Sequence, residues 1–336
     1  MNIFEQQRGN QRKTWIILVV FILFFLFLGY GFDALYFGFN PSTLLTASPQ
    51  FPFATLFALG VSGFTSWLGF SSGDKAVLAS AHAVPANPAN LKEKQAENIV
   101  AEMAIAAGLP PPKLYIVAEQ DPNAFATGTN PEHSSIAVTH GLLDVLNREE
   151  LQGVIAHEMS HIRNYDTQMM TIVAALVGGV ALLADWARRG MRFVSPRGRG
   201  RQKGAAPLVF LVVWMTAVLL APILSQLLAM AVSRKREYLA DASGAELTRN
   251  PMALAQALKK IEFSAAPTVS ISRGTAHLCI CDPLGRKMGL KEGFVADLLA
   301  THPPMVKRIT ALREMAFAGA REGLGREAGV VGGGGP

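Results

Sequence analysis

Three residues in the segment VIAHEMSHIRNYD have the types and the spacing needed to bind and use one metal ion. His157 and His161 are four residues apart, and Glu158 follows the first histidine. On a helix, side chains four residues apart lie on one face, so both imidazoles can reach a single ion. The carboxylate between them lies where it can take a proton from a water molecule on that ion. A shuffled chain of this composition would contain the pattern with a probability below about 0.01. The alternative is a pair of histidines that only pack against or solvate a helix.

A catalytic zinc site usually has three protein ligands, because its fourth position is left to water. The best candidate for the third ligand is Glu237 in SRKREYLAD. Asp241 lies four residues later on the same face of a predicted helix, where it can accept a hydrogen bond from the free ring nitrogen of a ligand histidine and fix its tautomer. Taken alone, Glu237 would be an ordinary solvated charge in a basic run, so its assignment depends on the histidine pair.

The composition indicates that part of the chain lies in a membrane. Apolar residues make up 50% of the sequence and charged residues only 17%, which is too apolar for a wholly soluble globular protein. Each of four apolar stretches reaches the roughly 17 to 25 residues of a spanning helix. These stretches are 14–32, 51–70, 167–184 and 205–233. A cleaved signal peptide is the alternative for the first, and a buried helix of a soluble domain for the third. The last two stretches separate His161 from Glu237, and two crossings return the chain to the same side.

The stretches divide the chain into an N-terminal transmembrane hairpin, the first part of a catalytic domain, a second hydrophobic pair with a basic loop, the second part of the catalytic domain, and a disordered glycine-rich tail. The expected bounds are 1–70, 71–166, 167–233, 234–317 and 318–336. Periodicity predicts helices over 91–109, 141–146, 148–164, 233–249, 252–263 and 303–317. Short strands are predicted at 113–119 and 134–141, joined by residues 121–133. The fold class is therefore α+β and predominantly helical, with a small sheet and about four transmembrane helices.

The charge of the chain favours a lipid surface over nucleic acid. The formal net charge is +6, but seven basic residues lie within 188–203, between two hydrophobic stretches. Lipid headgroups are the natural partner of such a loop, and no nucleic acid is expected. The two cysteines, Cys279 and Cys281, cannot form a disulfide framework, which fits a reducing compartment.

The segments around the metal-binding pattern resemble the HtpX-type membrane-integrated metalloproteases of the gluzincin class. The likeness covers nearly the whole chain and includes GDKAVL, MAIAAGLPPPKLYIV, NAFATG, HEMSH, SRKREYLAD and THPPMVKRI. It implies a gluzincin-like domain with one Zn²⁺ per chain, held by His157, His161 and Glu237, with Glu158 as the catalytic residue. It also implies a cytoplasm-facing endopeptidase of the bacterial inner membrane that acts on unfolded or membrane proteins in quality control.

The resemblance also suggests roles for residues outside the metal-binding pattern. In gluzincins a later histidine or tyrosine often helps to bind the oxyanion, and His302 in THPPMVKRI is placed for that role. A histidine of a helix cap region with no catalytic role is the alternative. Arg308 is expected to support this segment or to contact substrate.

The stretch from Asn123 to Gly128 resembles the edge of the substrate cleft in such enzymes. An exposed strand edge can hold an extended peptide by backbone hydrogen bonds that do not depend on side chains. A simple loop between strands is the alternative. The substrate-binding residues predicted here are Asn123, Ala124, Phe125 and Ala126.

The orientation in the membrane follows from the basic residues near the N-terminus. Arg8, Arg12 and Lys13 precede the first apolar stretch, whereas residues 33–50 contain no Lys or Arg. The positive-inside rule therefore places the N-terminus, and after two crossings the catalytic parts, in the cytoplasm. The basic loop at 188–203 would then lie on the far side, against the same rule. The expected location is the cell inner membrane, crossed several times.

Three other functions match parts of the pattern. A membrane scaffold or chaperone with structural zinc would need a fourth protein ligand, often a cysteine, and none is apparent in the sequence. A transporter would carry charges within its membrane stretches, where this chain has almost none. A protease that trims prenylated C-terminal peptides would keep the chemistry and change the substrate, although such enzymes have more membrane helices.

Overall fold

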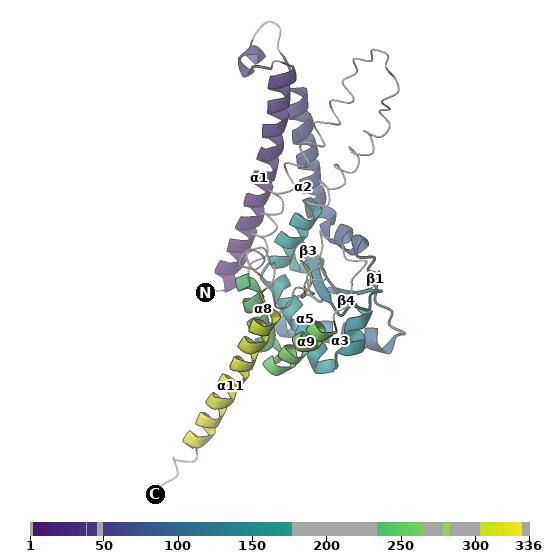
Figure 1. Cartoon of the computed structure of the whole chain (residues 1–336), viewed down its shortest axis with the longest axis vertical. Helices are drawn as coiled ribbons and strands as arrows, with labels where there is room; N and C mark the ends of the chain where they lie inside the picture. Colours follow the sequence, from purple (N-terminus) through teal and green to yellow (C-terminus); the bar gives the residue numbers. More distant parts are fainter. Residues whose placement is uncertain are drawn as a thin grey trace.

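The structure, a computed structural model, describes residues 3–37, 39–45, 50–176, 234–264, 278–281 and 303–330. Two long helices, α1 (Ile3–Tyr36) and α2 (Phe53–Ser80), form a hairpin that projects from a helical domain with one small sheet (Figure 1). Asp33, near the end of α1, joins the two helices. Its carboxylate accepts hydrogen bonds from the backbone N–H groups of Ala54 and Thr55, at 3.0 and 2.8 Å. These groups have no partner within the first turn of α2, so Asp33 acts as a cap supplied from the neighbouring helix.

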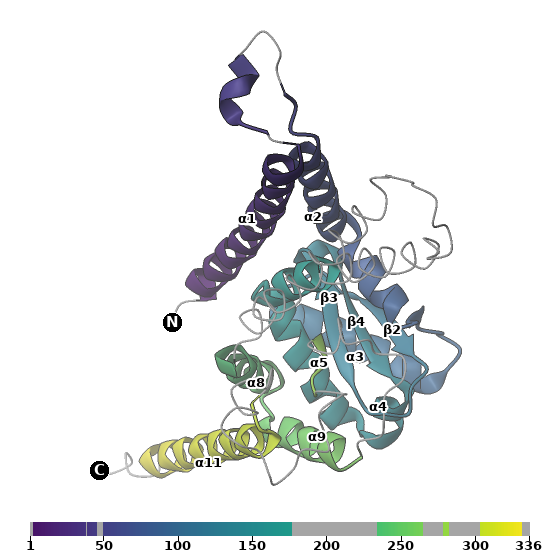
Figure 2. The ribbon, with the colours of Figure 1, turned by 45° about the horizontal axis from the view of Figure 1, so that its top comes forward.

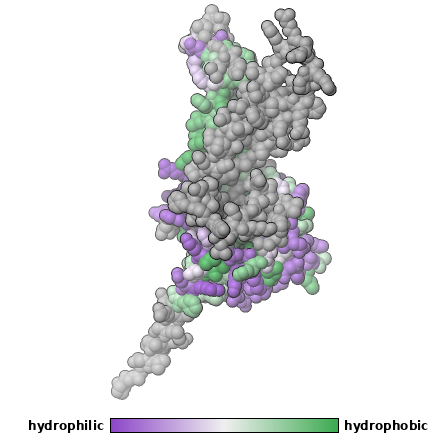
Figure 3. Space-filling model, viewed as in Figure 1, coloured by the Kyte–Doolittle hydropathy of each residue, from purple (hydrophilic) through white to green (hydrophobic). Residues whose placement is uncertain are grey.

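The hairpin has the length and surface of a membrane anchor. Two helical segments, Gln7–Ala34 and Phe53–Ser80, are long and apolar enough to cross a bilayer. Large side chains such as Phe27, Phe57 and Trp67 are more than half exposed along it, and Figure 3 shows hydrophobic residues following the hairpin above a largely hydrophilic domain. The structure thus supports the first two of the four expected transmembrane helices. Of the other two, only residues 167–176 fall within the described part, and residues 177–233 lie outside it.

The sheet has four strands in the order β1-β2-β4-β3. They are β1 (Val84–Pro85), β2 (Lys113–Val117), β3 (Ala124–Gly128) and β4 (Ser134–Thr139). Strands β2 and β4 run parallel, and β3 pairs antiparallel with β4. The sequence predicts β2 and β4 as strands, and for residues 123–128 it leaves open a strand edge or a loop. The structure shows a strand there, in which Phe125 and Thr127 favour β-structure and β4 supplies the partner.

The catalytic domain is built around α5 (Arg148–Arg163), the helix that carries the HEMSH segment. Around it pack α3 (Leu91–Ala107), α8 (Arg234–Thr248) and α9 (Pro251–Phe263), with the sheet alongside (Figure 2). The short helix α4 (His140–Val145) links β4 to α5. All of these helices confirm sequence predictions. One hydrophobic core contains residues from both polar halves of the chain, so the two halves form one folded unit.

The long helix α11 (Met305–Val330) corrects one expectation. The glycines from residue 318 onward predict a disordered tail. In the structure the helix continues to Val330 and projects away from the domain (Figure 1). The alanines between the glycines favour the helix over the coil. Residues 331–336 lie outside the described part.

Candidate metal centre

Three side chains from two helices meet at one buried point, as the sequence predicts. His157 and His161 come from α5 and Glu237 from the first turn of α8. All three are buried, and their ligand atoms lie within 4.8 Å of one another. The close approach of the two helices depends on Gly244 of α8, because a Cβ there would come within 3.0 Å of the backbone nitrogen of His157. A residue without a side chain therefore lets α8 bring Glu237 to the histidines.

The distances between the ligand atoms fit a single zinc ion. The two histidine Nε2 atoms are 3.2 Å apart, and they lie 3.6 Å (His161) and 3.9 Å (His157) from the oxygens of Glu237. Ligand atoms about 2.0 to 2.1 Å from a tetrahedral zinc ion are about 3.3 Å apart, so little adjustment is needed. Two histidines and a glutamate are also one of the recurring ligand sets of catalytic zinc, with one position left open. The residues present therefore fit the predicted metal.

Asp241 and Arg308 support His157 and Glu237 from behind. Asp241 Oδ1 lies 2.9 Å from Nδ1 of His157, the position that the sequence analysis predicts for it. Arg308 donates from Nε and Nη2 to the two oxygens of Asp241, at 2.8 and 2.7 Å. Its Nη1 lies 3.3 Å from Oε2 of Glu237. Burial opposes ionisation of Asp241, but the charge and hydrogen bonds of Arg308 outweigh it and lower the pKa of that carboxyl group. The aspartate thus stays ionised and can orient the imidazole.

Burial and the neighbouring carboxylates act differently on the two histidines. Burial lowers the pKa of His157 despite the hydrogen bond to Asp241. Burial also opposes the charged form of His161, but its hydrogen bond to Asp166 and the charge of Glu237 raise its pKa to about 9. A metal ligand must be a neutral imidazole, so metal binding has to displace a proton from His161 near neutral pH.

Glu158 lies beside the ligand cluster in a dry environment. Its side chain is almost fully buried, and its Oε1 atom has no hydrogen-bond partner within the described part of the chain. Burial raises the pKa of this carboxyl group to about 7, and the nearby charge of Glu237 acts in the same direction. The backbone of Ala126 on β3 supplies an opposing hydrogen bond. A carboxyl group whose pKa lies near the working pH is suited to accept a proton and to give it back.

The outer edge of β3 faces this site but already has partners along part of its length. Residues 278–281 lie against it, with a bridge between Phe125 and Cys279 and a hydrogen bond from Ile280 N–H to the Ala124 carbonyl at 2.9 Å. The side-chain amide of Asn123 donates to the carbonyl of Cys281 at 3.0 Å. The four predicted substrate-binding residues 123–126 are all buried. Their role in binding substrate remains a prediction.

The structure describes one of two further predicted site residues, Arg308, and not the other, His302. His302 lies outside the described residues, so the structure says nothing of its role. Arg308 is fully buried against Asp241 and Glu237, a contact that the sequence does not predict, and its contact with substrate stays a prediction.

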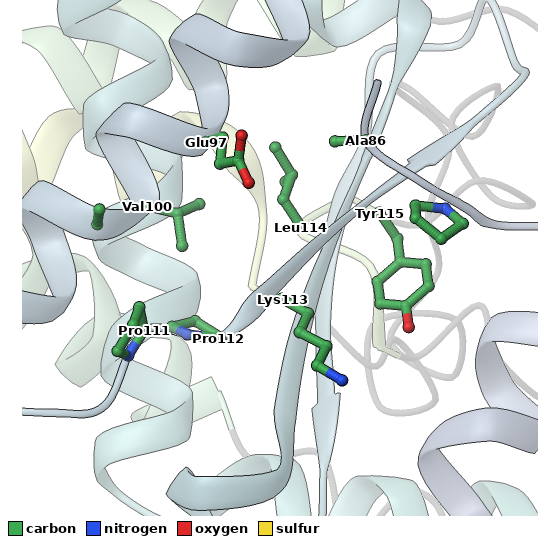
Figure 4. Close-up of a pocket in the computed structure, with 10 residues that line it drawn as sticks. Ala86, Glu97, Val100, Pro111, Pro112, Lys113, Leu114 and Tyr115 are labelled. Carbon is green, nitrogen blue, oxygen red and sulfur yellow. The ribbon is translucent and has the colours of Figure 1, made fainter. Parts of the chain in front are cut away.

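A cavity of about 610 Å³ lies elsewhere, between α3 and the β1–β2 edge. Figure 4 shows its lining, with Glu97 and Val100 of α3 facing Leu114 of β2, and prolines at one end. None of the residues that line this cavity belongs to the metal cluster. The cavity is therefore separate from the metal cluster.

Two residues beside His161 could not be found by the sequence patterns used above. Asp166 Oδ2 lies 3.2 Å from Nδ1 of His161, and Arg236 Nη1 lies 3.6 Å from the other oxygen of Asp166. Both residues are buried. Asp166 stands five residues after His161, just beyond the end of α5, and an acidic residue so close to a ligand histidine is a usable signal. Arg236 gives no such signal, because it stands in a basic run that looks solvated.

A metal-dependent peptidase anchored in a membrane is the class that this fold and site define. Comparison with known proteins agrees, since residues 90–316 match Peptidase family M48. The chain belongs to this family. A protein named Protease HtpX homolog from Thermoanaerobacter pseudethanolicus is 41% identical over 314 residues, covering 93% of this chain and 98% of that protein. The protein of the same name from Dictyoglomus turgidum is 40% identical over 320 residues, covering 93% and 94%.

One solved structure resembles the chain more distantly. The crystal structure of S. mikatae Ste24p matches with a TM-score of 0.43 and 16% sequence identity. The match covers 92% of this chain and 66% of that one.

Proposed function

We propose that the chain is a zinc-dependent endopeptidase of the cell inner membrane that cleaves unfolded or membrane proteins on the cytoplasmic side, in protein quality control. The observation that carries the proposal is the meeting of His157, His161 and Glu237 at one buried point, with Glu158 beside them. The relatives named Protease HtpX homolog support peptide hydrolysis.

Each residue of the site has a separate task in this proposal. His157, His161 and Glu237 would hold the zinc ion, which when bound supplies Lewis acidity and lowers the pKa of water. Glu158 takes a proton from the attacking water and then delivers it to the leaving amine. The raised pKa of Glu158 makes both transfers accessible near neutral pH. Arg308 and Asp241 keep the ligands Glu237 and His157 in place.

The contacts between the anchor and the domain support the proposed orientation. Gln7, near the start of α1, donates from Nε2 to the carbonyl of Arg163 at 2.7 Å. This contact supports a topology in which the N-terminal end of α1 is on the same side of the membrane as the catalytic domain. Because that end carries Arg8, Arg12 and Lys13, the positive-inside rule favours the cytoplasm.

The experiment measures the rate at which an unfolded protein substrate is cleaved. It compares the wild-type full chain with its Glu158→Gln variant, both in detergent and loaded with zinc. We expect Glu158→Gln to bind one zinc ion as the wild type does and to lose activity by about 10²- to 10⁴-fold. Glu149→Gln, an exposed change on the same helix, is the matched control and should retain activity. Wild-type cleavage rates in Glu158→Gln would refute the mechanism. A chain that binds zinc but cleaves nothing would instead support the structural-zinc scaffold.

A further inference from the structure

The first helix of the membrane anchor contacts the end of the helix that carries both histidines. Gln7 and Asn10 of α1 each donate a hydrogen bond to a backbone carbonyl there, Arg163 at 2.7 Å and Asn164 at 2.9 Å. Carbonyl groups at the C-terminal end of a helix have no hydrogen-bond donor within the helix, and these two side chains provide the missing donors. Both contacts join segments more than 150 residues apart in the sequence.

Asn10 makes a second contact that Gln7 does not make. Its Nδ2 atom also donates to Oδ1 of Asp166 at 2.8 Å. The other oxygen of Asp166 lies 3.2 Å from Nδ1 of His161. A continuous chain of two polar contacts thus runs from the anchor helix to a predicted metal ligand, and Asn10 and Asp166 are both nearly fully buried.

The geometry points to Asn10 as a positioning residue for His161, acting through Asp166. This inference rests on the zinc site proposed above. Both hydrogens of the Asn10 amide are used, one on the Asn164 carbonyl and one on Asp166. The amide therefore fixes the carboxylate relative to the end of α5, and Oδ2 is left facing the imidazole. A partner that holds the second ring nitrogen sets the tautomer and direction of a ligand histidine.

Loss of Asn10 would remove a hydrogen-bond donor from the Asp166 carboxylate. Among the described residues, Arg236 also lies near Oδ1, with its Nη1 3.6 Å away. Without the amide, the carboxylate can turn toward this guanidinium to recover a close hydrogen bond, because a buried charge needs donors. Turning would move Oδ2 away from His161. The affinity for metal then falls even though no ligand has been changed.

The test measures zinc affinity in the full chain in detergent, by competition with a chromophoric chelator. Changing a residue that holds a metal ligand typically costs 10- to 100-fold in affinity. We expect such a loss for Asp166→Ala, and a smaller loss of about 3- to 10-fold for Asn10→Ala, which acts one contact further out. Gln7→Ala is the matched control, because it removes an anchor contact to the same helix end and leaves Asp166 untouched. It should bind zinc as the wild type does.

Two further measurements separate positioning from simple anchoring. Asn10→Ala added to Asp166→Ala should cause no additional loss of affinity, because the two residues act in series. The d–d absorption spectrum of the cobalt-substituted protein should change for Asn10→Ala and not for Gln7→Ala. Thermal unfolding of the metal-free proteins checks that each variant is folded, and Asn10→Ser replaces Asn10→Ala if the latter is not.

Wild-type zinc affinity in a folded Asn10 variant would overturn the inference, as would an equal loss in Gln7→Ala or additive losses in the double variant. Because the readout is metal binding, the two proposals can fail separately. A wild-type chain that binds no zinc would overturn the proposed function and this inference together. Normal zinc binding by the wild type with no effect of Asn10 would overturn this inference alone.

Discussion

Arg308 donates two hydrogen bonds to the carboxylate of Asp241, and both residues are buried. This pair lies directly behind the predicted zinc ligands. We predict that Arg308→Ala destabilises the fold by about 3 to 5 kcal/mol, because it leaves a buried carboxylate without its counter-charge. It should also lower zinc affinity, since Asp241 then has no fixed position beside His157. Thermal unfolding and zinc competition measure the two effects. Arg313→Ala, at an exposed position of the same helix, should change stability by less than about 0.5 kcal/mol.

Gly244 provides a test in which helix propensity and packing oppose each other. In an exposed helix, Gly→Ala would be stabilising by about 1 kcal/mol. Here the added Cβ would meet the backbone of His157 at 3.0 Å, so Gly244→Ala should destabilise by about 1 to 3 kcal/mol through overpacking. It should also weaken zinc binding by moving Glu237 away from the histidines. Ser243→Ala on the same helix is the control. A stabilised Gly244→Ala protein with normal zinc affinity would contradict the packing argument.

The affinity for zinc should rise with pH. The pKa of His161 in the metal-free protein is raised to about 9, and the imidazole has to be neutral to bind metal. Zinc therefore displaces a proton, and the apparent affinity should rise about tenfold per pH unit between pH 7 and about 9. Competition titrations at several pH values, with proton release followed by a pH indicator, measure this. Affinity that does not change over this range would show that His161 is already neutral.

The raised pKa of His161 also predicts that the metal-free protein becomes less stable as the pH rises, whereas its zinc affinity increases. The folded-state pKa of His161, about 9, lies above the ordinary value of 6.5. The protonated imidazole therefore stabilises the fold fully below about pH 6.5, and this contribution is lost as the pH rises toward 9. Thermal unfolding of the metal-free chain across this range should show the loss, whereas zinc-loaded protein should not show it.

Asp33 should stabilise the hairpin of the membrane anchor. Asp33→Ala removes the cap from the N-terminus of α2 and should cost about 0.5 to 2 kcal/mol. Thr55→Val removes only the hydroxyl hydrogen bond to the same carboxylate and leaves the two backbone bonds, so its effect should be smaller. Unfolding in mixed detergent micelles measures both changes. Equal effects would show that the backbone hydrogen bonds contribute nothing.

The two histidine ligands could be predicted from the sequence because their spacing is local. His157 and His161 share a helix face by periodicity alone, and Asp241 has the same relation to Glu237. Glu237 itself is distant in sequence, and it could be chosen only because a catalytic zinc needs a third protein ligand. The sequence also predicts β2 and β4, whose apolar residues and β-branched side chains favour a strand.

The features that were missed depend on contacts between distant segments. For β3 the sequence leaves a strand edge and a loop open, and only the pairing with β4 decides for the strand. Asp166 and Arg236 look like solvated charges in sequence, and only the packing of α5, α8 and α1 buries them. Asn10 lies at the polar start of an apolar helix, so no pattern connects it with a histidine about 150 residues later. The helix through residues 318–330 was missed because its glycines outweighed its alanines in the prediction.

The position of Asn10 along α1 bears on how close the metal cluster lies to a bilayer around the anchor. A helix of 34 residues is about 51 Å long, whereas the hydrocarbon layer is about 30 Å thick. The apolar run begins at Thr14, only one turn, or roughly 6 Å, beyond Asn10. Asn10 contacts Asp166, which lies beside His161, so a bilayer that covers the apolar run of α1 would have the metal cluster close to its surface. Under the function proposed above, a polypeptide that leaves the bilayer would then reach the site within a few residues, whereas a compact soluble domain would first have to unfold.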